Sequence, residues 1–238
     1  MPRRRLGKSS GNTMSSLNLA QSTFMHAIAV FGLAAAFPVH STQFFAMKGQ
    51  VQLQRVQTVS TAVVGMPLEE ADVIVVPPEA EALVHFDDGA QMVVRGDSQV
   101  SFTHLSLTGP PTQRQKTLRL LKGSMRYLSG KSTPGNRVSF ESKSVIIGIR
   151  GTDIEIAVTD DGLDGNPAGT YLKVNTGQAV LSGLDGTQVE LERGQVAFGA
   201  EPELTPRGIS IVRRPSARPM PAVPAGLFKT GSMDSLLR

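Results

Sequence analysis

Short runs in which apolar and polar residues alternate recur through the second half of the chain. Four such runs cover residues 138–142, 154–158, 172–175 and 189–192. In each run every second side chain is apolar, so one face is expected to be buried and the other to contact water, which is typical of a β-strand. The pattern predicts an all-β fold, a single domain of many short strands arranged as a β-sandwich or a short β-roll.

The segment Gly148-Ile149-Arg150-Gly151-Thr152 lies at the centre of this region. Two glycines three residues apart within a strand pattern predict a backbone bend or bulge that a Cβ atom would obstruct. One interpretation is that the segment is purely structural. The other is that the bend holds Arg150 outward, where its planar guanidinium meets an anion or a partner.

A hairpin is predicted between residues 83–86 and 92–94. The intervening Asp87-Asp88-Gly89-Ala90 contains Asp-Gly, which favours a tight turn because glycine adopts positive φ readily. The tripeptide Arg95-Gly96-Asp97 has the form of an adhesion motif, but its place between two strand patterns favours a simple turn.

Groups that could bind a metal or catalyse a reaction are sparse. His85 and His104 are the only histidines after residue 41, and neither lies in a cluster of carboxylates, so no metal site is expected. Asp87 and Asp88 are neighbours, so in a strand their side chains would point to opposite faces. Residues 160–166 resemble a loose calcium loop, and a solvated hairpin loop and a structural Ca²⁺ site both remain open. We expect no catalytic residue, no cofactor and no enzyme activity.

Composition narrows the function classes further. Aromatic residues make up 5% of the chain and Trp is absent, which argues against stacking platforms for sugars or bases. The chain has no cysteine, which excludes disulfides, thiolate nucleophiles and Cys-ligated zinc. The formal charge of +4 equals the four cations that precede residue 42, and a tail with six cations and three anions leaves residues 42–200 slightly acidic. An acidic body is not expected to bind nucleic acid.

Both ends of the chain differ from its middle. Residues 1–46 are predicted to be a signal peptide, because a basic start precedes an apolar run at residues 27–37 that is shorter than the ~20 residues of a membrane span. General secretion is favoured over a twin-arginine route, and an uncleaved anchor is the alternative. We therefore expect a periplasmic or secreted protein without a stable membrane span. Residues 201–238 are rich in proline and basic, and are predicted to be an extended, partly disordered tail.

Several motifs together resemble the FecR-type domain, the periplasmic part of the ferric-citrate regulator family. The resemblance covers residues 49–200. It rests on Gly-centred motifs, of which residues 145–154 are the most specific. The matching positions, expected to be structural with a possible binding role, are Asp88, Gly89, Gly123, Gly148, Arg150, Gly151, Thr152, Gly177 and Gly194.

The resemblance implies a non-enzymatic β domain in the bacterial envelope. In the regulators this domain passes a signal across the inner membrane to a sigma factor, which requires a membrane span before the domain. Only a short signal-like segment precedes residue 49 here, so we expect a stand-alone exported module that binds an envelope protein or a cell-wall component. Two alternatives are a signalling component linked to sigma/anti-sigma regulation and an enzyme.

Overall fold

The computed structural model describes residues 42–106, 114–130, 137–160, 166–200, 204–205, 208–209, 215–228 and 230–237. The chain divides into two compact units, residues 1–38 and 39–238, and every described residue belongs to the second. In the described residues the only helical element is a four-residue 3₁₀ turn, so the all-β prediction is confirmed. No helix in these ranges is long and apolar enough to cross a membrane.

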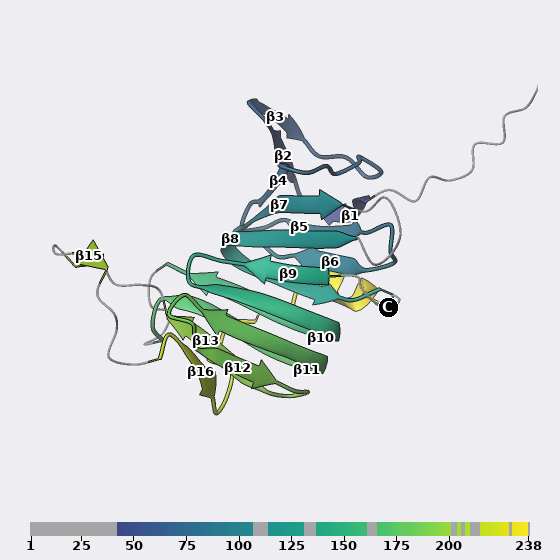
Figure 1. The fold of residues 1–238 in the computed structure, drawn as a ribbon. Coiled ribbons are helices and arrows are strands. Elements are labelled where there is room, and N and C mark those ends of the chain that lie inside the picture. Colours follow the sequence, from purple (N-terminus) through teal and green to yellow (C-terminus); the bar gives the residue numbers. More distant parts are fainter. Residues whose placement is uncertain are drawn as a thin grey trace, which may run out of the picture. The chain divides into compact units, whose positions relative to one another are not determined.

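The elements occur in the following order (Figure 1). They are β1 (Gln43–Lys48), β2 (Gln52–Arg55), β3 (Thr58–Thr61), β4 (Val73–Val76), β5 (Glu81–His85), β6 (Gln91–Val94), β7 (Ser98–Ser106), β8 (Gln115–Leu128), β9 (Arg137–Glu141), β10 (Val145–Thr159), β11 (Gly169–Gly183), β12 (Gln188–Leu191), β13 (Val196–Ala200), β14 (Leu204–Thr205), β15 (Gly208–Ile209), β16 (Ala217–Met220) and η2 (Met233–Leu236).

Three long strands, β8, β10 and β11, organise a single 14-stranded sheet. Figure 1 shows them side by side, with β9 between the first parts of β8 and β10. Each long strand changes neighbours partway along. The first part of β8 pairs with β7 and β9, and its second part pairs with β6 and β10. The first part of β11 pairs with β13, and its last part pairs with β12. The sheet thus folds over on itself around a large buried cluster, and a second, smaller cluster contains Tyr171, Phe198 and Leu227.

Glycines with positive φ mark the places where the long strands change neighbours. Gly123 in β8 has φ +83°, Gly151 in β10 has φ +59° and Gly177 in β11 has φ +80°. The register between β10 and β11 shifts between Arg150 and Asp153, which places a bulge beside Gly151 as the sequence predicted. Gly148 differs from the prediction: its φ is not positive, and a Cβ there would meet nothing within 4 Å.

The core takes side chains from both parts of each long strand. Leu118 and Tyr127 of β8 belong to the same buried cluster, although they lie on either side of Gly123. Tyr127 packs edge-on against Phe140, with ring centroids 5.0 Å apart. The predicted hairpin is present as β5 and β6, with Gly89 at φ +81° in its turn.

The folded domain begins earlier than residue 49. β1 pairs with β5, and Phe44 is completely buried. Residues 43–46, which the prediction included in the export segment, therefore lie in the sheet.

The C-terminal tail is more ordered than its composition predicted. β16 pairs with β13, Leu227 is buried, and residues 233–236 form η2. Proline is compatible with β16 because an edge strand needs few backbone donors. The Pro-rich composition indicated disorder because the tail has little apolar surface of its own. The apolar surface against which it packs belongs to the sheet, so the composition of the tail does not reveal it.

Candidate binding groove around Gly148 and Arg150

The segment that the sequence singled out lies on the outer face of the first part of β10. Ile147 points into the core, whereas Ile146 on the outer face is 50% exposed. Continuing that alternation, Gly148 and Arg150 also face outward. Gly148 lies beside Ser139 of β9 on one side and Val180 of β11 on the other.

These outward positions line an open groove of about 790 Å³. Gly148 forms part of its floor, because a Cβ added there would project into open space. The neighbouring floor residues, Ser139 and Val180, are small or of medium size. Ser139, Gly148 and Val180 form a row across β9, β10 and β11. Because Gly148 has no side chain, nothing from the middle strand fills the groove.

The groove has basic and acidic groups on its walls. Arg137 and Arg150 supply cations, and Glu190 and Glu192 supply carboxylates. All four residues are exposed. The guanidinium groups of Arg137 and Arg150 make no ion pair or hydrogen bond with the described residues, so they are available to a ligand. Arginine presents a planar fork of donors that matches a carboxylate or a phosphate.

The remaining residues of the central motif build the bend beside the groove. Thr152 is 1% exposed, and its backbone N–H donates to Ser129 Oγ at 3.0 Å. A Cβ at Gly177 would lie 2.3 Å from the carbonyl oxygen of Gly151, so only glycine allows this close approach of β10 and β11. Gly151, Thr152 and Gly177 are therefore supports that position Arg150.

The other predicted positions lie away from the groove. Asp88 Oδ2 accepts a 2.6 Å hydrogen bond from Lys116 Nζ, and Lys116 is completely buried with its ammonium 4.4 Å from the centre of the Phe86 ring. Burial lowers the pKa of Lys116, and the Asp88 carboxylate opposes that shift. Gly89 and Gly194 have φ of +81° and +83° in tight turns.

Gly123 has a packing role in a different part of the fold. A Cβ at Gly123 would lie 2.2 Å from Ser98 Oγ and 2.4 Å from the carbonyl oxygen of Asp97, so β7 and β8 approach there at a distance that only glycine allows.

The sequence also pointed to two histidines, an adhesion-like tripeptide and a possible calcium loop, and none of their described residues lines the groove. His85 stacks on Phe45 with ring centroids 3.7 Å apart, and burial lowers its pKa. His104 Nδ1 lies 3.2 Å from Glu70 Oε2. Neither histidine lines the groove. Arg95 is 5% exposed, so the Arg95-Gly96-Asp97 tripeptide does not present its arginine to a partner. Most of the possible calcium loop, residues 161–165, lies outside the described residues.

Sequence reasoning missed part of the groove. Arg137, Gln178, Glu190 and Glu192 line it but lie up to 55 positions apart, on β9, β11, β12 and the turn that follows β12. Only strand pairing brings them together. The alternation in residues 189–192 does place Glu190 and Glu192 on one face, which is the one signal that could have linked them.

The comparisons with known proteins concern the fold. Two crystal structures of a protein described as a candidate anti-sigma factor, from Parabacteroides distasonis ATCC 8503, are similar to this chain at 13% and 12% identity, with TM-scores of 0.44 and 0.43. In both cases the alignment covers 54% of this chain and 54% of that chain, so it spans about half of their length. No curated protein matches this chain.

A family model gives the clearest comparison. The match is to the FecR protein family and extends over residues 72–180. It begins directly before β4, includes all three long strands up to the last part of β11, and contains the Gly148–Thr152 segment. The chain therefore carries a FecR-type domain.

Proposed function

We propose that this protein is a non-catalytic binding module of bacterial envelope signal transduction, exported as a FecR-type domain that engages an envelope protein or a cell-wall component. The observation that carries the proposal is the exposed Arg150, which has no partner among the described residues and stands over a groove whose floor is open at Gly148. The FecR match over residues 72–180 supports the envelope assignment.

The chemistry of the groove indicates what the partner presents. Arg137 and Arg150 suit an anionic group, such as a side-chain carboxylate or the carboxylate of a cell-wall peptide. Glu190 and Glu192 suit a cationic or amide group close by. A ligand with both kinds of group would be oriented in the groove, because reversing it would bring like charges together.

Binding rather than catalysis is favoured by the groups that the groove contains. General acid–base or nucleophilic catalysis needs a nucleophile within hydrogen-bond reach of a base, with a third group that orients the base. The described lining residues present arginines, glutamates, glutamines and one serine, and Ser139 Oγ is hydrogen-bonded to Thr117 Oγ1 at 3.1 Å. In the described part of the chain, no group of three or more His, Asp or Glu side chains is placed to hold a metal.

The second candidate is a component that acts on a sigma/anti-sigma pair. The FecR match favours it, because the family takes its name from a regulator. Fractionation of the native bacterium distinguishes the two. A chain that retains its N-terminal segment in the inner membrane supports the regulator, whereas a processed chain in the periplasmic fraction supports the exported module.

Site-specific photocrosslinking tests the groove directly. A benzophenone amino acid at Gln178, which is exposed and lies opposite Arg150, is expected to crosslink a partner in living cells. The same probe at the exposed Gln52 of β2 serves as the position control.

Two variants decide whether the groove itself is responsible. Arg150→Ala and Gly148→Val should each abolish the adduct at position 178, whereas Arg193→Ala, an exposed arginine outside the groove, should leave it intact. An adduct of unchanged yield in both groove variants would refute the proposed site.

A further inference from the structure

The described residues 215–228 and 230–237 are called here the C-terminal segment. A second hollow, of about 460 Å³, lies where this segment crosses the sheet. Its lining includes Lys48, Glu81, Arg95 and Ser124 of the sheet region, together with Thr230 and Gly231 of the C-terminal segment. This hollow shares no lining residue with the groove around Arg150. The C-terminal segment therefore forms one wall of a site whose other walls belong to the FecR-type domain and to β1 before it.

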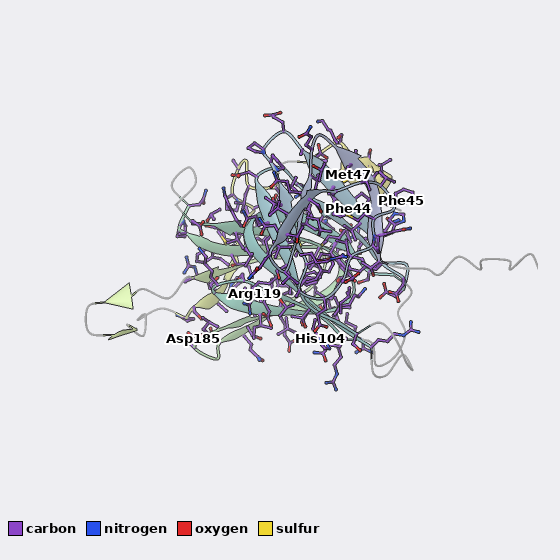
Figure 2. All side chains as sticks on the ribbon, turned by 90° about the horizontal axis from the view of Figure 1, so that it is seen from above. Phe44, Phe45, Met47, His104, Arg119 and Asp185 are labelled. Carbon is purple, nitrogen blue, oxygen red and sulfur yellow. The ribbon has the colours of Figure 1, made fainter. Side chains whose placement is uncertain are left out.

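The segment is attached to the sheet at both ends. At its start, Asp185 in the turn between β11 and β12 accepts hydrogen bonds from the backbone N–H and the hydroxyl of Ser216. At its end, η2 contacts β1 and β5. Figure 2 shows Asp185 well separated from Phe44 and Met47 of β1. Between these ends, Leu227 packs against Tyr171 and Phe198.

The last turn inserts one carboxylate into an arginine site. Asp234 accepts hydrogen bonds from Arg95 Nη2 at 2.7 Å and from Arg95 Nε at 3.1 Å. It also accepts a 2.7 Å bond from the backbone N–H of Gly231, and Arg126 Nη1 lies 3.7 Å away. Glu81 holds the same turn from the sheet, because it accepts bonds from Ser232 Oγ and the Met233 N–H.

Without Asp234 the site would carry excess positive charge. Its other members are three cations and two carboxylates, namely Arg95, Arg126, Lys173, Asp153 and Glu155. Arg95 and Glu155 are almost fully buried, so solvent compensates their charges poorly. An anion is therefore needed to neutralise the site, and the structure shows a peptide carboxylate in that position.

Two features indicate that this occupant can be replaced. Arg95 lines the hollow, and its Nη1 is buried with no hydrogen-bond partner among the described residues, so the site has a donor that its own segment does not use. In addition, Thr230, Ser232, Ser235 and Leu236 are exposed. Asp234 is the one residue of the last turn that is buried, so the turn is held mainly by polar contacts.

We propose that the Arg95–Arg126 site binds a carboxylate-bearing turn of another protein, and that residues 230–237 occupy it in the free chain as a substitute ligand. The partner's segment would present an aspartate or glutamate to Arg95 and a backbone or hydroxyl donor to Glu81, as Asp234, Ser232 and Met233 do here. Binding of the partner would displace the last turn.

The test uses a fluorescent synthetic peptide of residues 226–238 as the probe and the full chain as the receptor. The unmodified chain should bind the peptide weakly, because its own segment competes. A chain with Asp234→Asn and Ser232→Ala should bind it at least ~10-fold more tightly, since the loss of a charged hydrogen-bonded pair corresponds to a factor of ten or more. Fluorescence anisotropy measures both affinities.

Matched controls separate this site from general charge effects. A chain with Glu69→Gln, an exposed carboxylate paired with Arg55 and outside the hollow, should bind the peptide like the unmodified chain. A peptide carrying Asp234→Asn should bind the double variant at least ~10-fold more weakly than the unmodified peptide. Adding Arg126→Gln to the double variant should also weaken binding.

Two results would overturn the proposal. One is equal affinity of the unmodified and double-variant chains for the peptide. The other is equal affinity of the double variant for the two peptides. Peptide binding that needs both the acid and the vacated site would support it.

Discussion

Two arginines of the domain, Arg150 and Arg95, differ in how exposed they are and in whether a carboxylate of the described residues contacts them. Arg150 is exposed at the rim of an open groove and contacts no carboxylate in the described residues. Arg95 is 5% exposed and lies 2.7 Å from both Glu155 and Asp234. An arginine is thus neutralised within the chain at one position, and at the other it is exposed, where we propose that an external ligand binds.

The difference follows from how the two faces of the sheet are covered. Beside Arg150 nothing crosses the outer face of β10 in the described structure, so Ile146 remains 50% exposed. Beyond the bend, Glu155 and Ala157 face outward but are only 6% and 2% exposed. Ala157 packs in one cluster with Leu227 of the C-terminal segment, and Glu155 is bonded to Arg95 and Lys173. A charged side chain that is buried under protein, such as Arg95, needs an oppositely charged partner within the chain. A charged side chain that stays exposed, such as Arg150, can pair with a group of another molecule.

Loss of the buried arginine should have the largest effect. Arg95→Ala leaves Glu155 and Asp234 without their shared partner, and breaking a buried ion pair costs about 3–5 kcal/mol. Urea unfolding monitored by circular dichroism measures the change in the free energy of unfolding. If Arg95→Ala were no more destabilising than Arg150→Ala, the proposed contrast between the two sites would be wrong.

The two glycines of the central motif should respond differently. Gly151→Val forces a β-branched residue into φ +59°, which costs about 1–3 kcal/mol. Gly148→Val places its side chain in the open groove, so we expect a loss of stability below about 1 kcal/mol. Thermal unfolding of the two variants in parallel measures the difference, and equal destabilisation would contradict the assignment of Gly148 to the floor of the groove.

Acid should loosen the occupied site and leave the groove unchanged. The pKa of Glu81 is lowered: burial alone would raise it, but hydrogen bonds from Met233 and Ser232 outweigh burial. A carboxyl with a lowered pKa in the docked state stabilises docking above its ordinary pKa of 4.5, and loses that contribution as the pH falls through the lowered value.

Hydrogen exchange checks this pH dependence. The protection factors of amides in residues 230–237, relative to those of β10, should fall below about pH 4.5, and by up to about tenfold for each unit of pKa shift. Glu81→Gln removes the contribution of Glu81, so its pH profile should be shallower. A flat profile in the unmodified chain would mean that the Glu81 carboxylate does not hold the last turn.

Removal of the exposed arginine should have the smallest effect on folding. Arg150→Ala deletes a side chain without a partner in the described structure, and such surface changes alter stability by less than about 0.5 kcal/mol. Its effect should appear in partner binding alone. A large loss of stability would show that Arg150 has a structural contact, and would remove the basis for treating the groove as a binding site.

Alternation and glycine placement predicted the inner face of the fold well. Ile154, Ile156 and Val158 all belong to the core, as their spacing in residues 154–158 indicated. The Asp-Gly turn after Asp88 and the bend at Gly151 are also present, because both depend on local backbone preferences. The prediction that Gly148 takes part in the bend was wrong. Glycine occurs both where the backbone bends and where a surface must stay free of side chains, and the sequence alone does not distinguish these two roles.

The outer face was decided by tertiary structure. Glu155 and Ala157 were predicted to contact water because they alternate with core residues, yet Leu227, 70 positions further along, packs with Ala157, and Arg95 and Lys173 bond to Glu155. Which residues line the groove depends likewise on the pairing of β9, β10, β11 and β12. Periodicity reports which side chains share a face of a strand, since that follows from local geometry. Whether that face is then open or covered depends on contacts between distant parts of the chain, and those are formed only when the sheet folds.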